Sequence, residues 1–171
     1  MSTPRRKRAV LFDLDNTLVI TDALEPLRRA GDWRAVYGRF RETILPVGTP
    51  KFLQELAREF TLGVVTKSQR RYAEKLVAYH KLDIPVLIAY HDVTKQKPHP
   101  EGLLKAAAKL AVEPTNCIYI GDHADDIEAG RAANTRPILV CWNSRGQSHS
   151  ECAGLHTWQE VLTAISQIVE E

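Results

Sequence analysis

Short β-branched and apolar runs alternate along this chain with segments of helical periodicity, and this alternation constrains the fold more than any other feature. Parallel strands need a crossover connection between them, which is usually a helix. The pattern therefore predicts an α/β fold with a central parallel sheet of about five strands covered by helices. We expect strands near residues 9–12, 62–66, 86–89, 117–120 and 137–141. We expect helices near residues 49–60, 69–80, 100–110, 125–133 and 158–168.

The length and charge of the chain fit one soluble domain. Its 171 residues suffice for one substantial core, and no repeat, low-complexity segment or long linker divides them. The formal net charge is only +2, and no apolar run reaches the roughly 20 residues that a membrane span needs. We therefore predict a single domain over residues 1–171 with no membrane association.

The cysteines and the N-terminus indicate a cytoplasmic protein. Cys117, Cys141 and Cys152 form neither a disulfide framework nor a close-spaced metal motif, so we expect reduced, buried thiols. The basic run Arg5-Arg6-Lys7-Arg8 precedes an apolar segment that two aspartates interrupt, which a signal peptide would not tolerate. The basic run is expected to be solvated, and nucleic-acid binding through it is the less favoured alternative.

The first predicted strand ends in the run Asp13-Leu14-Asp15-Asn16-Thr17. Carboxylates two residues apart at the end of a buried parallel strand emerge together into the crevice where open α/β sheets bind ligands. Two neighbouring carboxylates repel each other unless a cation lies between them, which indicates a hard divalent ion such as Mg²⁺. One aspartate can then attack a substrate while the other handles protons.

Two further strand ends carry groups that suit a phosphate. The Thr66 hydroxyl and the backbone N–H groups after it can bind phosphoryl oxygens, with Ser68 placed to cap the next helix; a simple turn or cap is the alternative. Lys97 lies in the stiff segment Lys97-Pro98-His99-Pro100 and can neutralise both a nucleophile and a phosphate. A solvent-facing lysine is the alternative there, and Lys95 fits that description better.

The fourth predicted strand ends in Asp122, which leaves its strand as Asp13 does. Asp122 can therefore complete a metal site with Asp13 and the backbone carbonyl of Asp15. Asp126 follows one helical turn later, so it can face the same site and orient the nearby lysine or a metal-bound water. Asp125 is expected to point elsewhere. The alternative for Asp125 and Asp126 is that these acidic residues at the start of a helix only complement the helix dipole.

Together these segments resemble the haloacid dehalogenase-like (HAD) hydrolases, and within them the phosphoglycolate phosphatase-like branch. The resemblance covers roughly residues 8–145 and follows the family's order of motifs. It rests on Asp13-Leu14-Asp15-Asn16-Thr17, Thr66, Lys97-Pro98-His99-Pro100 and Gly121-Asp122 with Asp126. It implies a Rossmann-like, HAD-like three-layer sandwich with a helical cap inserted after the first strand.

The resemblance also implies an activity: Mg²⁺-dependent hydrolysis of phosphomonoesters through an aspartyl-phosphate. Asp13 would be the nucleophile, and Asp15 the general acid and then the general base. Mg²⁺, Thr66 and Lys97 would hold the phosphoryl oxygens. Dehalogenation is disfavoured because dehalogenases lack an aspartate at the place of Asp15. A small phosphorylated metabolite is the expected substrate.

The cap insert, at about residues 19–45, is short for the four-helix cap common in that branch. A reduced cap leaves the site open, so that protein or nucleic-acid ends can enter, or a partner subunit, as in a homodimer, completes the site. The apolar residues of the insert recur at helical spacing and are expected to pack against the domain; they are Trp33, Val36, Tyr37, Phe40 and Ile44. Arginines between them make a basic surface the less favoured alternative.

Two smaller departures from the family pattern concern Lys67 and Asn134. Lys67 stands where relatives frequently have Asn, and it can add a phosphate contact of its own. Asn134 replaces a common Gly after the last crossover helix, and Asn tolerates the left-handed geometry that ends a helix.

Two other functions stay open: a phosphatase of phosphoproteins or polynucleotide ends, and a non-catalytic phosphate-binding or scaffolding member of the family.

Overall fold

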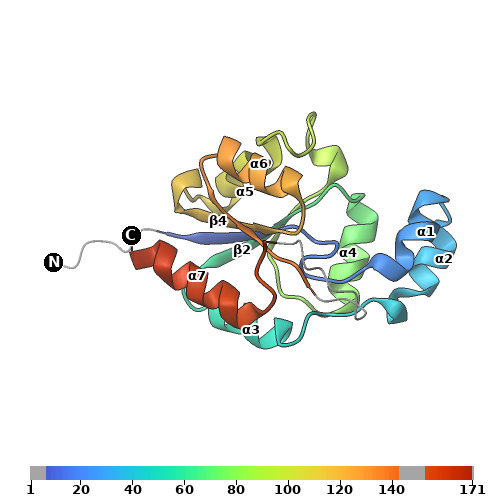
Figure 1. The fold of residues 1–171 in the computed structure, drawn as a ribbon. Helices are drawn as coiled ribbons and strands as arrows, with labels where there is room; N and C mark the ends of the chain where they lie inside the picture. The colour runs from blue at the N-terminus through green and yellow to red at the C-terminus, as the bar shows by residue number, and fades with distance from the viewer. Residues whose placement is uncertain (1–6, 143–152, 171) are drawn as a thin grey trace.

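The computed structural model of this chain describes residues 7–142 and 153–170 and contains one parallel five-stranded sheet (Figure 1). The strand order is β3-β2-β1-β4-β5, and all pairs are parallel. The strands are β1 (Ala9–Phe12), β2 (Thr61–Val65), β3 (Val86–Ile88), β4 (Cys117–Gly121) and β5 (Arg136–Leu139). The predicted α/β class and strand number are confirmed.

Five helices follow the predicted pattern. They are α3 (Thr49–Leu56), α4 (Arg70–Tyr79), α5 (Glu101–Leu110), α6 (Ala124–Ala132) and α7 (Trp158–Glu170). Helix α3 ends earlier than predicted because the backbone tightens into i→i+3 hydrogen bonds, with Glu59 N donating to Leu56 O at 3.0 Å. Asn134 has φ of 57°, so it adopts the predicted left-handed conformation after α6.

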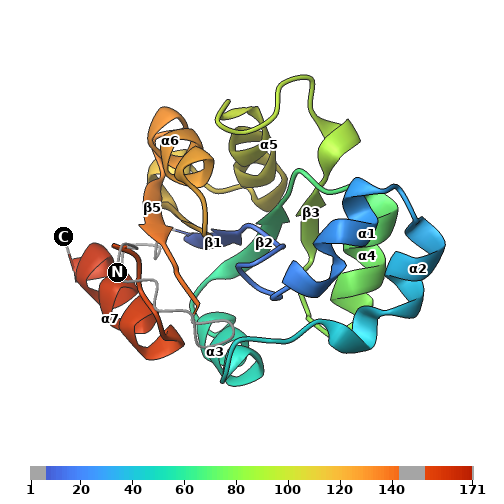
Figure 2. The same cartoon turned by 45° about the vertical axis from the view of Figure 1, so that its right-hand side comes forward.

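The sheet is the middle of three layers (Figure 2). Alternate residues of each strand point to opposite faces, so Phe12 packs in one apolar cluster and Leu11 in the other. Side chains of α3, α4 and α7 complete the first cluster, and those of α5 and α6 complete the second. Both faces of the central strands are therefore buried, as parallel sheets require.

The strand order determines where ligands can bind. The chain moves outward from β1 to β2 and β3 on one side, and then crosses to β4 and β5 on the other. In the register, Phe12 of β1 pairs with Val64 of β2 and Ile120 of β4. The carboxyl ends of these three strands are thus adjacent at a topological switch point, where α/β sheets bind their ligands.

Four short helices lie between β1 and α3; together we call them the helical insert. They are η1 (Asp22–Leu24), α1 (Glu25–Arg29), α2 (Trp33–Gly38) and η2 (Phe40–Glu42), and they lie beside α4 (Figure 2). The short helices η3 (Tyr90–Asp92) and η4 (Pro114–Asn116) complete the described elements. Val36 and Phe40 are buried, so the predicted packing of the apolar stripe is confirmed there, whereas Ile44 is 57% exposed.

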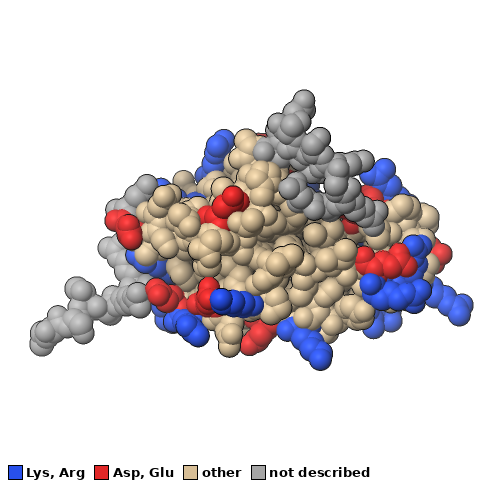
Figure 3. Space-filling model, turned by 60° about the horizontal axis from the view of Figure 1, so that its bottom comes forward, with Lys and Arg blue, Asp and Glu red and all other residues tan. Residues whose placement is uncertain are grey.

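The charges of the insert are mixed rather than uniformly basic. Arg29 Nε lies 2.8 Å from Glu25 Oε1, and Arg39 Nη2 lies 2.5 Å from Glu42 Oε2. In the space-filling view, basic and acidic side chains lie next to one another at this end of the molecule (Figure 3). Because acidic side chains lie among the arginines, the face that Figure 3 shows has no continuous basic surface for a phosphorylated polymer at this end.

The cysteine prediction holds at one position and fails at another. Cys117 is buried with a free thiol, as expected. Cys141 takes part in a disulfide, so the expectation of a reduced thiol is wrong for that residue. Cys152 lies outside the described residues. Over residues 7–142 and 153–170, no helix has both the length and the apolar character needed to span a bilayer.

Candidate active site

Asp13 and Lys97 form a buried ion pair where β1 ends. Lys97 Nζ lies 2.8 Å from Asp13 Oδ1 and 2.6 Å from Asp126 Oδ1, and it contacts the Tyr119 hydroxyl at 2.8 Å. Burial acts to lower the pKa of Lys97, but the charges of Asp13 and Asp126 outweigh burial and raise it. The lysine therefore stays charged between two carboxylates, at the position where a phosphate would need a cation.

Asp126 holds Lys97 through a network that depends on a close approach to β4. Its Oδ1 also accepts from the Tyr119 hydroxyl at 2.8 Å, and its Oδ2 accepts from the backbone N of His123 at 3.1 Å. A Cβ at Gly121 would lie only 2.4 Å from Cβ and Cγ of Asp126. Glycine at position 121 thus lets the helix-borne carboxylate pack directly over the strand end.

Three carboxylates gather beside this ion pair. One oxygen each from Asp13, Asp122 and Asp126 lies within 4.8 Å of the others. Burial, followed by the neighbouring carboxylates but opposed by Lys97, raises the pKa of Asp13 to about 7. Burial and Asp126 likewise raise the pKa of Asp122, whose Oδ1 accepts from Thr17 Oγ1 at 3.1 Å. Such a cluster of oxygen donors with excess negative charge fits a hard divalent cation.

The three carboxylates are not equivalent as metal ligands. Both oxygens of Asp126 already accept hydrogen bonds from protein groups. Asp122 has one such contact, and Asp13 has its contact with Lys97. The geometry therefore suits Asp13 and Asp122 as direct ligands, with Asp126 behind them and holding the lysine.

Asp15 accepts four side-chain hydrogen bonds. Its Oδ1 accepts from Thr21 Oγ1 at 2.9 Å, Arg28 Nη1 at 2.8 Å and the Tyr72 hydroxyl at 2.7 Å. Its Oδ2 accepts from Ser68 Oγ at 2.5 Å. Ser68 thus binds Asp15 and does not cap α4, whose N-cap Gln69 makes no side-chain hydrogen bond. The four donors fix the orientation of the carboxylate at the edge of the site.

Thr66 and Lys67 follow β2 on the other side of the site. Thr66 is buried, and its Oγ1 accepts from the backbone N of Ser68 at 3.0 Å, which stabilises the turn. Lys67 Nζ lies 2.5 Å from Asp125 Oδ2 at the rim, so Asp125 is part of the site's surroundings, contrary to expectation. Lys95, expected to be solvated, is exposed.

A cleft of about 350 Å³ connects most of these groups. The predicted residues that line it are Asp13, Asp15, Thr66, Lys67, Lys97 and Asp126. Its remaining lining residues are Asn16, Glu25, Arg28, Ser68, His123 and Asp125. The insert thus contributes to the cleft through Glu25 and Arg28, and the cleft is small and polar.

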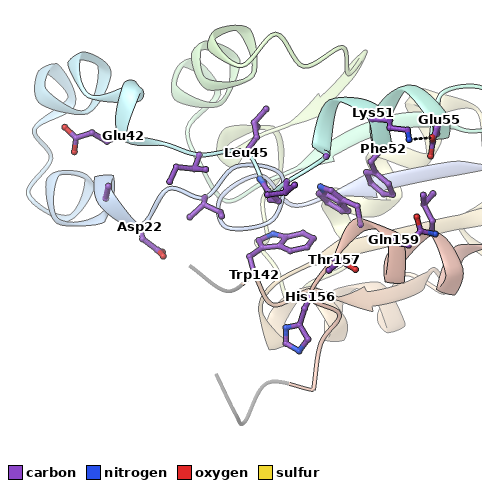
Figure 4. A pocket seen from close by; sticks show the side chains of 18 residues that line it. Asp22, Glu42, Leu45, Lys51, Phe52, Glu55, Trp142, His156, Thr157 and Gln159 are labelled. Carbon is purple, nitrogen blue, oxygen red and sulfur yellow. Dashed lines mark ion pairs between the residues drawn. The ribbon is translucent and has the colours of Figure 1, made fainter. Parts of the chain in front are cut away.

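A larger apolar pocket of about 610 Å³ lies elsewhere, between α3 and the start of α7 (Figure 4). Trp142, Phe52 and Leu45 face it, with Glu42 and Asp22 at its outer end (Figure 4). None of the predicted catalytic residues lines this pocket. The smaller cleft is therefore the candidate active site, because Asp13, Lys97 and Asp126 meet there.

Comparison with known proteins identifies the family of this chain. The model of the haloacid dehalogenase-like hydrolase family matches residues 32–140, a segment that contains Thr66, Lys97, Asp122 and Asp126. The chain belongs to the haloacid dehalogenase-like hydrolase family. The family match begins after Asp13 and Asp15, so their assignment rests on the sequence motif and on the geometry described above.

Relatives of known name share part of their length with this HAD-like chain. The pyrophosphatase PpaX of Bacillus mycoides is 34% identical over 102 residues, which are 58% of this chain and 47% of PpaX. PpaX of Bacillus cereus matches to the same extent. The chain therefore spans about half the length of the curated relatives it matches.

Solved structures share the fold over almost the whole chain. A HAD phosphatase from Thermococcus onnurineus aligns with a TM-score of 0.76 and 21% identity, covering 92% of this chain and 97% of that one. A HAD-superfamily hydrolase from Geobacter sulfurreducens aligns with a TM-score of 0.69 and 19% identity, covering 92% and 99%. The predicted HAD-like three-layer fold is confirmed by this similarity.

Proposed function

We propose that this HAD-like protein is a Mg²⁺-dependent phosphomonoester hydrolase that acts through an aspartyl-phosphate on Asp13. The observation that carries the proposal is the buried contact of Asp13 with Lys97 at the switch point of the sheet. A carboxylate beside a fixed ammonium group, inside a polar cleft, suits attack on a phosphoryl group. The family membership supports a hydrolase.

The reaction has two steps, and Asp15 acts in both. An oxygen of Asp13 attacks phosphorus, the bond from phosphorus to the ester oxygen breaks, and Asp15 in its protonated form gives a proton to the leaving oxygen. Asp15 then takes a proton from water, and this water attacks the phosphorus of the aspartyl-phosphate. Phosphate leaves and the Asp13 carboxylate is restored, so that one carboxyl group serves as acid and then as base.

Lys97 and Thr66 bind and orient the phosphoryl group in this proposal. Lys97 is held in place by Asp126 and Tyr119, so its charge is fixed before substrate arrives. The Thr66 hydroxyl lies beside the cleft and can donate to a phosphoryl oxygen while accepting from Ser68 N. Lys67 can add a contact if it exchanges Asp125 for the substrate.

Asp13, Asp122 and the backbone carbonyl of Asp15 would hold Mg²⁺. When bound, the ion neutralises charge on the phosphoryl oxygens and on the clustered carboxylates. Burial raises the pKa values of Asp13 and Asp122 most, the neighbouring carboxylates raise them further, and the charge of Lys97 opposes both effects. The clustered carboxylates favour a cation in the site.

A small phosphorylated metabolite fits the cleft best. The volume of about 350 Å³ accommodates a phosphoryl group with a short leaving group. Two structural neighbours bear the name phosphoglycolate phosphatase, and phosphoglycolate is of this size. A cytoplasmic location would fit such a substrate.

Hydrolysis of a generic aryl phosphate tests the proposal. Wild type and Asp13→Asn are compared, each with Mg²⁺ and with chelator. We expect phosphate release only from wild type with Mg²⁺, and at least about a 10³-fold loss in Asp13→Asn. Asp83→Asn, at an exposed aspartate outside the cleft, is the matched control. Metal-independent release, or full activity in Asp13→Asn, would contradict the mechanism.

The shortness of the insert favours one second candidate, a phosphatase of phosphoprotein or polynucleotide ends. Only the short helices η1, α1, α2 and η2 stand between β1 and α3. Larger substrates can therefore reach the site, unless a second copy or a partner subunit covers it. Phosphopeptides and 5′-phosphorylated oligonucleotides belong in the substrate screen, and steep salt dependence would indicate the oligonucleotides. Phosphate binding without turnover of any substrate would indicate a non-catalytic member.

A further inference from the structure

Arg28 is the residue by which the helical insert reaches the catalytic cleft. Its Nη1 lies 2.8 Å from Asp15 Oδ1, and its Nη2 lies 3.0 Å from Ser68 Oγ. The guanidinium carbon lies 4.8 Å from the centre of the Tyr72 ring. The side chain is only 22% exposed, so this cation is fixed in one place rather than free in solvent.

Arg28 lies where the leaving portion of a substrate would pass. It lines the catalytic cleft and also an adjoining groove of about 310 Å³. Residues Glu25, Lys67 and Ser68 line both hollows, while Trp33 and Tyr90 line only the groove. A substrate with its phosphoryl group at Asp13 and Lys97 would therefore extend outward along Arg28.

Asp15 does not depend on Arg28 alone for its position. Thr21, Ser68 and Tyr72 also donate to its carboxylate, and three donors remain if the arginine turns away. The contact between Arg28 and Asp15 is an ion pair at 2.8 Å with both side chains partly exposed, 22% and 16%. A second anion that takes the place of Asp15 keeps the guanidinium paired, so the exchange leaves no partly buried cation without a counter-ion.

We propose that Arg28 determines specificity by binding a second anionic group on the leaving portion of the substrate, in exchange for Asp15. This inference rests on the proposed phosphatase function. The preferred substrate class is then a phosphoester or phosphoanhydride whose leaving group carries a negative charge, such as inorganic pyrophosphate or a small phosphorylated carboxylic acid. The exchange also removes one of the three donors to Asp15 Oδ1, so that this oxygen has room for a contact with the leaving oxygen.

The reacting bonds are those of the proposed function. Asp13 forms the bond to phosphorus, the bond from phosphorus to the leaving oxygen breaks, and Asp15 supplies the proton. Arg28 makes no covalent bond and moves no proton. Its guanidinium presents several N–H donors in a planar fork, which suits bidentate binding of a carboxylate or phosphate.

Three substrates test the inference: inorganic pyrophosphate, 2-phosphoglycolate and phenyl phosphate, whose leaving group has no additional anionic group. In Arg28→Gln we expect kcat/KM to fall roughly 10- to 100-fold for the first two, as loss of a charged hydrogen bond predicts. For phenyl phosphate we expect a change below about threefold. Arg34→Gln, which removes an exposed charge from the same insert outside the cleft, should leave all three values unchanged.

The alternative is that Arg28 merely positions Asp15. In that case Arg28→Gln would reduce kcat/KM by the same factor for all three substrates, and the inference would be overturned. A selective loss on pyrophosphate alone would identify the second anion as a phosphate, and one on 2-phosphoglycolate alone would identify it as a carboxylate. Either selective result supports the inference.

A binding measurement separates failure of the inference from failure of the proposed function. Calorimetry on Asp13→Asn with Mg²⁺ compares inorganic pyrophosphate with inorganic phosphate. We expect pyrophosphate to bind at least about tenfold more tightly than phosphate, and this preference to disappear in Asp13→Asn/Arg28→Gln. Equal binding of both anions in Asp13→Asn would overturn the inference. Absence of all hydrolysis by wild type would overturn only the proposed function.

Discussion

The phenol of Tyr72 donates a hydrogen bond to Asp15 Oδ1 at 2.7 Å, which ties α4 to the loop after β1. Burial, together with the nearby charge of Asp15, raises the pKa of Tyr72 well above its ordinary value. The hydroxyl therefore stays protonated at neutral pH and remains a donor. Its bond orients the group that we propose as the general acid and base.

Tyr72→Phe should lower kcat roughly tenfold, with KM changed less than about twofold, because the variant loses one of the four hydrogen bonds that orient Asp15. The aromatic ring is kept, so its packing against Trp33 and Phe40 survives. Steady-state kinetics on an aryl phosphate with Mg²⁺ measure the effect. Tyr79→Phe is the matched control, because Tyr79 also packs on Phe40 but lies half exposed outside the cleft. Equal losses in both variants would speak against an orienting role.

Lys97→Met should lower the free energy of unfolding by about 3 kcal/mol at neutral pH, because it leaves Asp13 and Asp126 buried without their cation. In an Asp126→Asn background the same substitution should cost about 1–2 kcal/mol less, since one of the two carboxylates is already neutral. Urea unfolding of the four proteins in chelator gives the coupling free energy. Lys95→Met, at an exposed lysine, should change stability by less than about 0.5 kcal/mol. A coupling near zero would mean that Lys97 and Asp126 do not stabilise each other.

The strands were predictable because burial on both faces of the sheet gives continuous apolar runs in the sequence. The helices were predictable because their apolar residues recur at helical spacing. The site groups at strand ends were predictable for a related reason. Neighbouring parallel strands end at the same edge, so Asp13, Thr66 and Asp122 had to meet if β1, β2 and β4 were adjacent.

Several other residues of the site were not predictable in this way. Tyr119 lies within an apolar strand and Tyr72 within an amphipathic helix, where an aromatic residue normally signals only core packing. Arg28 belongs to the helical insert, and no local sequence signal indicates that α1 brings its side chain to the cleft. Ser68 had the position of a helix cap, but its hydroxyl donates to Asp15 instead.

Without metal, Asp13→Asn should be more stable than wild type by a margin that grows as pH rises from about 4 to 8. The folded protein holds the proton of Asp13 up to a pKa of about 7, whereas the unfolded chain releases it near 3.8. The folded state therefore binds more protons in this range, and its stability falls as pH rises through it. Asparagine has no such proton to lose, and Asp126 still pairs with Lys97 in the variant.

Thermal unfolding in chelator at several pH values measures this margin. We expect the difference in Tm to be near zero at pH 4 and at least about 3 °C at pH 8. Mg²⁺ should reduce the margin by stabilising wild type more than the variant. Asp83→Asn should show no pH-dependent margin, because Asp83 is exposed. A margin that shrinks with rising pH would mean that the pKa of Asp13 is lowered in the folded state.

Gly121→Ala should disrupt the site through Asp126 rather than through the strand itself. The new Cβ would lie 2.4 Å from Cβ and Cγ of Asp126, so the carboxylate must move away from Lys97 and Tyr119. We expect stability to fall by about 2 kcal/mol or more and kcat to fall at least roughly tenfold. Gly38→Ala is the control, because a Cβ there meets nothing within 4 Å and the backbone has no positive φ. Urea unfolding of both variants measures the change in stability, and aryl phosphate kinetics measure the change in kcat. An unchanged kcat in Gly121→Ala would show that the reaction does not need Asp126 in its observed position.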